Sequence, residues 1–274
     1  MSERDDYPPG VPCWVEALQP DPRAAVDFYG SLFGWEFDGP GPMDGGLPGE
    51  YFVAQLKGRD VAGIGSLPEL RTPPTGSWNT YVRVDSADEA AERATAAGGS
   101  LLAGPLDAPP AGRLAVLLDP TGAAFCVWEA DARTGAQLIN EPGTWAMSSL
   151  HTPDPERANE FYGALFGWRP EPFGPPDGAV TLWRLPGYVG GEPQQPVPRD
   201  VVAVMTPTGD EAPDVPPHWN VNFWVQDANA IVERAAGLGG RIIAPVFDTP
   251  GFRNAVVADP QWAVFSISQL IAAT

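Results

Sequence analysis

The chain has 274 residues, 43% of them hydrophobic, and its 16 basic against 35 acidic side chains give a net charge of -19. Such an acidic surface repels nucleic acid and anionic lipid, so both are excluded as partners and cationic ligands are favoured. No segment approaches the roughly 20 apolar residues of a membrane helix. No signal peptide is visible, and 2 cysteines give no disulfide framework. We therefore expect a cytoplasmic protein.

An internal duplication organises the chain. The octapeptide FYGSLFGW at 28–35 recurs as FYGALFGW at 161–168, and each copy follows an Asp-Pro pair at the same distance. Trp-Asn, Glu-Arg, Gly-Gly and Asp-Pro pairs then follow in the same order in both halves. Repeats of this kind indicate duplicated structural units. We predict two similar domains, 1–130 and 143–274, joined by a polar linker at 131–142.

Local signals place the elements of the first half in chain order. A strand is predicted at 13–18, followed by a helix at 22–33 that Asp21 caps and Gly34 ends. Strand-like runs at 51–56 and 61–67 flank a predicted turn at 58–60. A strand at 79–84, a helix at 87–97 and a hairpin of 115–118 with 124–128 complete the half. Each half is therefore predicted to contain two βαβββ units.

This order of strand, Asp-Pro, FYGxLFGW, Gly-Gly and Asp-Pro-x-Gly before the last strand resembles the vicinal oxygen chelate superfamily. That superfamily contains glyoxalases, bleomycin-resistance proteins and extradiol dioxygenases, and the chain looks most like its tandem two-domain actinobacterial members. The resemblance implies an α+β fold of two tandem glyoxalase-like domains, each with two βαβββ modules whose curved mixed sheets enclose a cleft. It does not fix the function, because this fold hosts isomerases, dioxygenases, thiol transferases and drug binders.

The resemblance also implies where metal-dependent members carry their ligands. These are a His on the first strand, a carboxylate on the fourth, a His or Gln on the fifth and a Glu on the last. The fourth-strand segments contain no carboxylate, and the other positions, first half before second, hold Trp14 and Met147, Asn79 and Asn220, and Cys126 and Ser266. A hard divalent metal in this fold needs carboxylate and imidazole donors. We therefore predict neither a metal nor a cofactor.

The side chains expected to face the two clefts are aromatic, amide and hydroxyl groups, because residues two apart on a strand share a face. The predicted ligand-binding residues are Trp14, Glu16, Asn79, Tyr81, Cys126 and Trp128 in the first half, and Met147, Ser149, His151, Asn220, Asn222, Trp224 and Ser266 in the second. Aromatic walls with a few polar anchors suit a planar apolar ligand. Structural roles remain open for several: Trp14 and Trp128 as plugs, Cys126 as an apolar filler and His151 as a hydrogen-bonded structural residue.

Two classes of function are compatible with these sequence features. The favoured one is a metal-independent protein that binds or sequesters an aromatic, amine-bearing natural product in antibiotic biosynthesis or self-resistance, with an anthracycline-type glycoside as the candidate. Drug-binding members of the superfamily, such as the bleomycin-resistance proteins, lack metal ligands and use aromatic clefts. The alternative is a metal-free enzyme in which His151, Glu16 and Tyr81 perform acid–base catalysis on an aromatic polyketide. Either way the partner is a small aromatic molecule; a monomer and a homodimer are both compatible with the sequence.

Overall fold

The computed structural model describes residues 3–67, 75–174, 179–190, 199–209 and 215–271. Each half contributes one sheet of eight strands. The elements of the first half are β1 (Pro12–Gln19), α1 (Pro22–Phe33), β2 (Glu36–Pro42), the short 3₁₀ turn η1 (Asp44–Gly46), β3 (Glu50–Leu56), β4 (Arg59–Ser66), β5 (Ser77–Val84), α2 (Ala87–Ala96), β6 (Ser100–Ala108), β7 (Gly112–Leu118) and β8 (Ala124–Ala130). Those of the second half are β9 (Trp145–Thr152), α3 (Pro155–Phe166), β10 (Arg169–Phe173), β11 (Val180–Arg184), β12 (Val201–Pro207), β13 (His218–Trp224), α4 (Ala228–Gly237), β14 (Arg241–Thr249), β15 (Phe252–Ala258) and β16 (Val264–Leu270).

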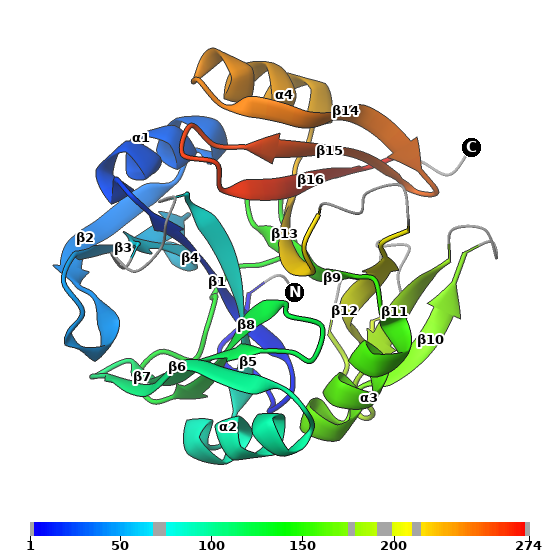
Figure 1. Cartoon of the computed structure of the whole chain (residues 1–274). Coiled ribbons are helices and arrows are strands. Elements are labelled where there is room, and N and C mark those ends of the chain that lie inside the picture. The colour runs from blue at the N-terminus through cyan, green and yellow to red at the C-terminus, as the bar shows by residue number, and fades with distance from the viewer. Residues whose placement is uncertain (1–2, 68–74, 175–178, 191–198, 210–214, 272–274) are drawn as a thin grey trace.

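Two βαβββ modules meet in the middle of each sheet. The first sheet has the strand order β2-β3-β4-β1-β5-β8-β7-β6, with β1 parallel to β4 and antiparallel to β5. The second sheet repeats this order from β10 to β14. Figure 1 shows the first sheet curling into a cup on the left, with α1 and α2 on its outer side. The predicted α+β fold of two tandem domains is confirmed.

Helix α1 begins and ends where the sequence predicts. The Asp21 carboxylate accepts hydrogen bonds from the backbone N–H groups of Arg23 and Ala24, and Gly34 ends the helix in the left-handed conformation at φ 76°. The predicted turn at 58–60 is wrong, because Arg59 and Asp60 already belong to β4. The β3–β4 turn is formed by Lys57 and Gly58, both with positive φ (55° and 69°), as two-residue hairpin turns require.

Four strands have sequences that resemble loops: β2 and β6, which the sequence analysis of the first half did not locate, and their second-half equivalents β10 and β14. Each contains at least one proline, and β2 and β6 also contain glycine, so the segments look like loops. All four are edge strands of their sheets. At an edge, proline is tolerated because one side of the strand donates no ladder hydrogen bonds.

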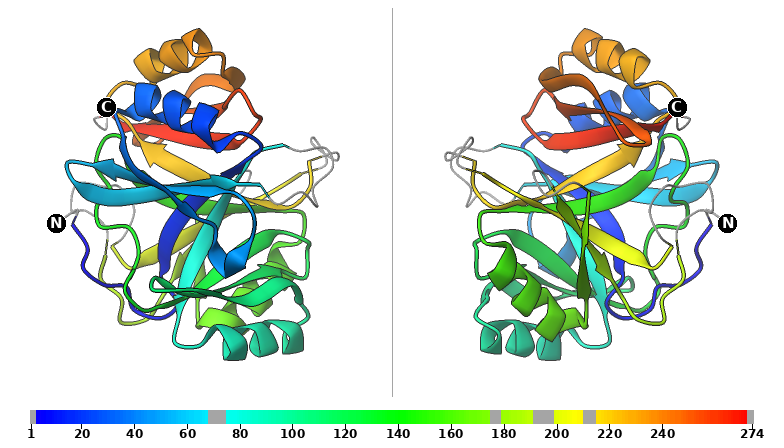
Figure 2. Two further views of the ribbon diagram at one scale, coloured as in Figure 1. Left: turned by 90° about the vertical axis from the view of Figure 1, so that its left-hand side faces the viewer. Right: turned by 90° about the vertical axis from the view of Figure 1, so that its right-hand side faces the viewer.

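The two domains pack against each other through the outer sides of their sheets. Strand β5 of the first domain contacts β13 of the second, and the Thr80 and Ser148 hydroxyls are hydrogen-bonded at 2.7 Å between β5 and β9. Helix α1 lies beside α4, and α2 lies beside α3, as Figures 1 and 2 show. None of the described helices is long and apolar enough to cross a membrane.

The repeated motifs form a reciprocal buried hydrogen-bond network across this interface. In one half, Trp78 Nε1 donates to the Tyr29 hydroxyl at 3.0 Å, which donates to the Asp259 carboxylate of the other domain at 2.9 Å. In the mirror arrangement, Trp219 Nε1 donates to the Tyr162 hydroxyl, which donates across to the Asp119 carboxylate. Burial raises the pKa of both tyrosines well above its ordinary value.

The tryptophan that ends each octapeptide also crosses the interface. Trp35 Nε1 donates to the carbonyl oxygen of Gly143, and Trp168 Nε1 donates to that of Gly10, both at 2.7 Å. Gly10 and Gly143 occupy equivalent places just before the first strand of each domain. The tyrosine and the last tryptophan of each octapeptide therefore bond to the other domain. Because both copies make the same contacts, the same residues are needed in both.

Candidate functional site

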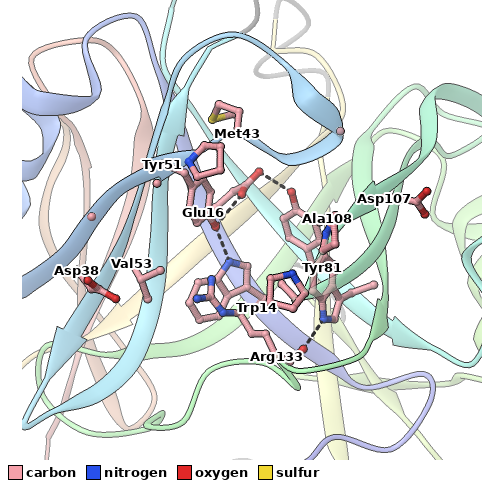
Figure 3. Close-up of a pocket in the computed structure, with 18 of the residues that line it drawn as sticks. Trp14, Glu16, Asp38, Met43, Tyr51, Val53, Tyr81, Asp107, Ala108 and Arg133 are labelled. Carbon is pink, nitrogen blue, oxygen red and sulfur yellow. Dashed lines mark hydrogen bonds between the residues drawn. The ribbon is translucent and has the colours of Figure 1, made fainter.

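A cavity of about 520 Å³ opens in the concave face of the first sheet (Figure 3). This volume lies within the range of roughly 300–1,000 Å³ that small-molecule sites occupy. The walls come from β1, β3, β5 and β8, and the rim from β2, η1 and the β6–β7 turn. The lining residues are Trp14, Glu16, Asp38, Gly39, Pro40, Gly41, Pro42, Met43, Gly45, Gly46, Tyr51, Val53, Tyr81, Asp107, Ala108, Pro109, Pro110, Ala111, Trp128, Arg133 and Gly135.

Strand register brings the central side chains together. Trp14 and Glu16 point into the cup from β1, and Trp14 lies directly opposite Tyr81 on β5. Tyr81 in turn is paired with Cys126 on β8, two residues before Trp128. Side chains at paired positions of neighbouring strands share a face. Once Trp14 on β1 faces the cavity, its paired residue Tyr81 must therefore face it too. The ring of Tyr81 meets that of Trp128 edge-on, with 6.3 Å between centroids.

A chain of hydrogen bonds converges on the Glu16 carboxylate, which is only 4% exposed. Trp14 Nε1 donates to the Tyr51 hydroxyl at 3.1 Å, and that hydroxyl donates to Glu16 Oε2 at 3.1 Å. The Tyr81 hydroxyl donates to Glu16 Oε1 at 2.5 Å. Burial is the main reason that the pKa of Tyr81 lies well above its ordinary value. Tyr81 therefore remains a protonated donor toward this carboxylate at neutral pH.

Glycines make room for the large side chains. A Cβ at Gly63 would lie 2.0 Å from the Tyr51 hydroxyl oxygen, so the side chain of Tyr51 occupies the space that another residue would fill. At Gly112, a Cβ would lie 2.8 Å from the Trp128 ring. Both glycines lie within strands, where such residues often permit close approach of a neighbouring group. The glycines at position 63 on β4 and position 112 on β7 thus leave the space that the large side chains of the cavity wall occupy.

Arg133 completes the cavity wall from the segment after β8. Its carbonyl oxygen accepts a hydrogen bond from Trp128 Nε1 at 2.8 Å, and its guanidinium lies 5.4 Å from the centroid of the Trp14 ring. The guanidinium also pairs with Asp60 at 3.9 Å. Asp38 and Asp107 lie exposed on opposite sides of the opening in Figure 3. The rim therefore carries two carboxylates, of which Asp107 is paired with Arg113, while the interior is mostly aromatic.

Four of the six predicted ligand-binding residues of the first half line the cavity: Trp14, Glu16, Tyr81 and Trp128. Asn79 and Cys126 are not among the lining residues. Burial raises the pKa of the Cys126 thiol, which agrees with an apolar filler rather than a reactive group. Tyr51, Met43 and Arg133 were missed. Tyr51 begins a predicted strand, and the alternating Gly63 and Gly65 of the next strand signal a bulky neighbour.

In the second domain the equivalent positions carry small polar groups that bond to one another. Asn220 Nδ2 donates to the Ser266 hydroxyl, and Asn222 Nδ2 donates to the Ser268 hydroxyl, both at 2.9 Å. Asn222 replaces Tyr81, and Ser268 replaces Trp128. Ser149 and Met147 stand where the first domain has Glu16 and Trp14, and the predicted Trp224 meets Phe252 edge-on. At the positions equivalent to Trp14, Tyr81 and Trp128, this cup therefore carries no aromatic side chain.

The two histidines of the chain stack on each other in the second domain. The rings of His151 and His218 are nearly parallel, with centroids 4.9 Å apart, and Ser149 Oγ lies 3.4 Å from His151 Nε2. Burial, together with His218, lowers the pKa of His151 to about 4, so the ring is neutral at pH 7. His151 does not line the cavity that contains Glu16 and Tyr81. The proposed catalytic trio is thus not assembled in one site.

The side chains at the family's ligand positions do not fit a divalent metal. Trp14 offers no ligand atom, Asn79 offers only an amide, and Cys126 is held as a buried thiol. Glu16 is the one carboxylate in the cavity interior, and its oxygens accept from two tyrosines. Among the described residues, no group of three or more His, Cys, Asp and Glu side chains is arranged to hold a metal ion.

The glyoxalase-like domain model matches residues 14–128 and 147–268, so the chain belongs to the glyoxalase-like domain family. Curated relatives cover nearly its full length. It is 37% identical over 273 residues to "Putative glyoxylase CFP32" of Mycobacterium tuberculosis, with 97% of each chain covered. It is 33% identical over 280 residues to "Anthracycline biosynthesis protein DnrV" of Streptomyces peucetius, covering 96% of this chain and 94% of that one.

Solved structures confirm the fold. The Mn(II)-bound glyoxalase from Novosphingobium aromaticivorans superposes with a TM-score of 0.63 at 17% identity, covering 97% of this chain and 84% of that one. The 2,3-dioxygenase LapB from Pseudomonas sp. KL28 gives a TM-score of 0.62 at 10% identity, covering 96% and 93%. Both belong to the vicinal oxygen chelate class that the sequence resembles, and at this identity they inform on the fold alone.

Proposed function

We propose that the first-domain cavity binds a planar aromatic natural product of the anthracycline class without a protein-held metal. The observation that carries this proposal is the cavity of about 520 Å³ walled by Trp14, Tyr51, Tyr81 and Trp128. Offset or edge-on contacts between aromatic rings contribute about 0.5–1.5 kcal/mol each beyond their buried area. The similarity to DnrV, whose name states anthracycline biosynthesis, supports this ligand class.

The charge distribution supports an amine on the ligand. Asp38 and Asp107 flank the opening, and the chain as a whole carries a net charge of -19. An ammonium group near this rim gains from the field, whereas the ring system occupies the aromatic interior. The protein would then bind and sequester the compound during its biosynthesis or as a form of self-resistance.

The test is a titration of an anthracycline glycoside at stoichiometric protein concentration. Quenching of tryptophan fluorescence with unchanged ligand mass supports binding. Because the chain has 10 tryptophans, the titration is repeated with Trp14→Phe and Trp128→Phe to identify how much of the quenching comes from the cavity. Conversion of the ligand to a product of different mass or isomeric form would instead support the metal-free enzyme, with Glu16 and Tyr81 as its acid–base groups. Absence of both signals would refute the proposed ligand class.

A further inference from the structure

Arg133 is the only basic residue among the described residues that line the cavity, and it lies beside Trp14 in Figure 3. Its guanidinium has five N–H groups in one plane, accepts no hydrogen bonds and stays positively charged at any ordinary pH. The central carbon of the guanidinium lies 5.4 Å from the centroid of the Trp14 ring. An aromatic face attracts the positive charge but offers no lone pair. The contact with Trp14 therefore supplies no conventional hydrogen-bond acceptor.

Asp60 is the charged partner of this guanidinium, and it is a distant one. Nε of Arg133 lies 3.9 Å from Asp60 Oδ2, which is beyond hydrogen-bond distance. The other oxygen of that carboxylate accepts a hydrogen bond from Gln55 Nε2 at 2.9 Å. No described residue accepts a hydrogen bond from the guanidinium, whose side chain is 30% exposed. Water or a bound ligand must therefore provide its acceptors.

The backbone fixes Arg133 beside the aromatic wall. The peptide N–H groups of Asp131 and Arg133 both donate to the carbonyl oxygen of Ala111, at 3.0 and 3.1 Å. The carbonyl oxygen of Arg133 accepts from Trp128 Nε1 at 2.8 Å. Both Ala111 and Trp128 line the same cavity. The guanidinium is thus attached to the walls of the site by its own main chain.

We propose, building on the proposed function, that Arg133 donates hydrogen bonds to a quinone carbonyl oxygen at the edge of the bound aromatic ligand. A quinone keeps the ring system planar, and its carbonyl oxygen accepts from the guanidinium without adding charge. A carboxylate also pairs with a guanidinium, but a further anion is disfavoured beside Asp38 in a chain of net charge -19. The site thus distinguishes a quinone from a hydrocarbon of the same ring shape.

A purely structural role for Arg133 leads to a different expectation. If the guanidinium only packs against Trp14, its removal takes away contact area and weakens all planar aromatic ligands alike. If it donates hydrogen bonds to the ligand, the loss is confined to ligands that carry a carbonyl oxygen. Two ligands and two proteins, measured as a cycle, separate the two roles.

The experiment measures the affinities of 2-(aminomethyl)anthraquinone and 2-(aminomethyl)anthracene by isothermal titration calorimetry. Both compounds have three fused planar rings and the same ammonium group, and only the first has carbonyl oxygens. We expect Arg133→Met to weaken the quinone about tenfold, as loss of a hydrogen bond from a charged donor implies, and the hydrocarbon no more than about twofold. Equal losses would overturn the inference and leave the proposed function intact. Failure of both compounds to bind the unaltered protein would contradict the proposed aromatic site itself.

Arg157→Met is the matched control. It makes the same change of side chain and of net charge at an exposed position of α3 in the second domain, outside the residues that line the cavity. We expect it to leave both affinities unchanged within about twofold. Melting temperatures of the two variants check that each is folded. A loss of quinone affinity in Arg157→Met equal to that in Arg133→Met would show that net charge alone causes the effect, and would contradict the inference.

An infrared measurement on the unaltered protein covers the case in which Arg133→Met does not fold. The quinone carries isotope-labelled carbonyl carbons, so that its stretching bands are separated from those of the protein. A hydrogen bond from a charged donor is stronger than one from water, and it weakens the C=O bond further. We expect one carbonyl band of the bound quinone at a lower wavenumber than in aqueous solution. Bands that all lie at or above their aqueous positions would overturn the inference.

Discussion

The two domains are most alike where they touch each other and least alike inside their cups. At the interface, Tyr29 with Asp259 and Tyr162 with Asp119 form the same hydrogen bonds in mirrored positions. In the cups, by contrast, the equivalent residues have different chemistry. Packing at a shared interface constrains both halves together, whereas the side chains inside each cup are free of that constraint. We infer from this difference that the first cup is the specialised one.

The largest effect is expected at the interface. Asp259 accepts hydrogen bonds from Tyr29, Gln19 and two backbone N–H groups, and it is completely buried. Asp259→Ala should lower the free energy of unfolding by about 3–5 kcal/mol, the range for breaking a buried polar network. Asp119→Ala should cost a similar amount, measured by denaturant unfolding. A loss below about 1 kcal/mol in both would show that the mirrored network does not stabilise the domain pair.

The next effect is a pH-dependent stability that His151 gives the second domain. At pH 7, His151 is neutral in both the folded and unfolded states. Below about 6.5 the unfolded chain gains a proton, which the folded protein accepts only near its pKa of about 4, so stability falls between these values. The loss should approach roughly 2–3 kcal/mol near pH 4. His151→Leu, which copies Leu18 of the first domain, should abolish that part; identical pH profiles for both proteins would contradict it.

Ligand affinity should separate the two cups directly. Trp14→Ala removes an aromatic wall of the first cup and should weaken anthracycline binding about tenfold, because contact area and a ring contact are both lost. Met147→Ala is the equivalent change in the second cup. We expect calorimetry to detect no more than a twofold change for this variant. Equal losses for the two variants would show that both cups bind the ligand.

A smaller effect tests the acidic rim. Affinity for an amine-bearing anthracycline should fall a few-fold as salt rises from low ionic strength to 0.1 M, where the Debye length is about 10 Å. The N-acetylated ligand should lose most of this dependence, because exposed ion pairs contribute only about 0.2–1 kcal/mol. If both ligands bind equally at low salt, the acidic surface does not select an amine, and a neutral aromatic ligand is preferred.

The smallest expected effect is that of metal removal. Because the family's ligand positions hold Trp14, Asn79 and Cys126, we expect treatment with EDTA to leave the melting temperature and the ligand affinity unchanged within error. Addition of Mn(II) or Ni(II) to the EDTA-treated, dialysed protein should also change neither quantity. Elemental analysis that finds a stoichiometric tightly bound metal would overturn this prediction.

Sequence reasoning reached the fold and part of the site for identifiable physical reasons. Helix α1 carries its own cap and stop residues, and strand alternation was sufficient to place Trp14 and Glu16 on one face. The edge strands β2 and β6 were not predicted because their prolines indicate a loop by local rules. An edge strand tolerates proline because one of its sides forms no ladder hydrogen bonds. Tyr51 and Arg133 were missed because they approach the cavity from β3 and from the segment after β8, a proximity that only tertiary folding creates.

The same limit applies to the octapeptide. Its tyrosine lies on the buried face of α1, but the hydrogen-bond partner of Tyr29 is Asp259, 230 residues away. No local periodicity reports such a pairing. The only sequence signal related to this pairing is the duplication, because both halves contain the tyrosine and the aspartate at equivalent positions: Tyr29 and Asp119, and Tyr162 and Asp259.

The exchange of tyrosine and aspartate between domains has a consequence for ancestry. Each half contains both partners of the contact, so a polypeptide equivalent to one half would be complementary to a second copy of itself. Two such copies would associate face to face with two-fold symmetry, each tyrosine reaching the other copy's aspartate. Duplication and fusion of that single-domain gene would keep the old subunit boundary as the present interface. After the fusion, the two cups would no longer have to share one sequence. The residues of one cup could then change while the other cup retained its ligand.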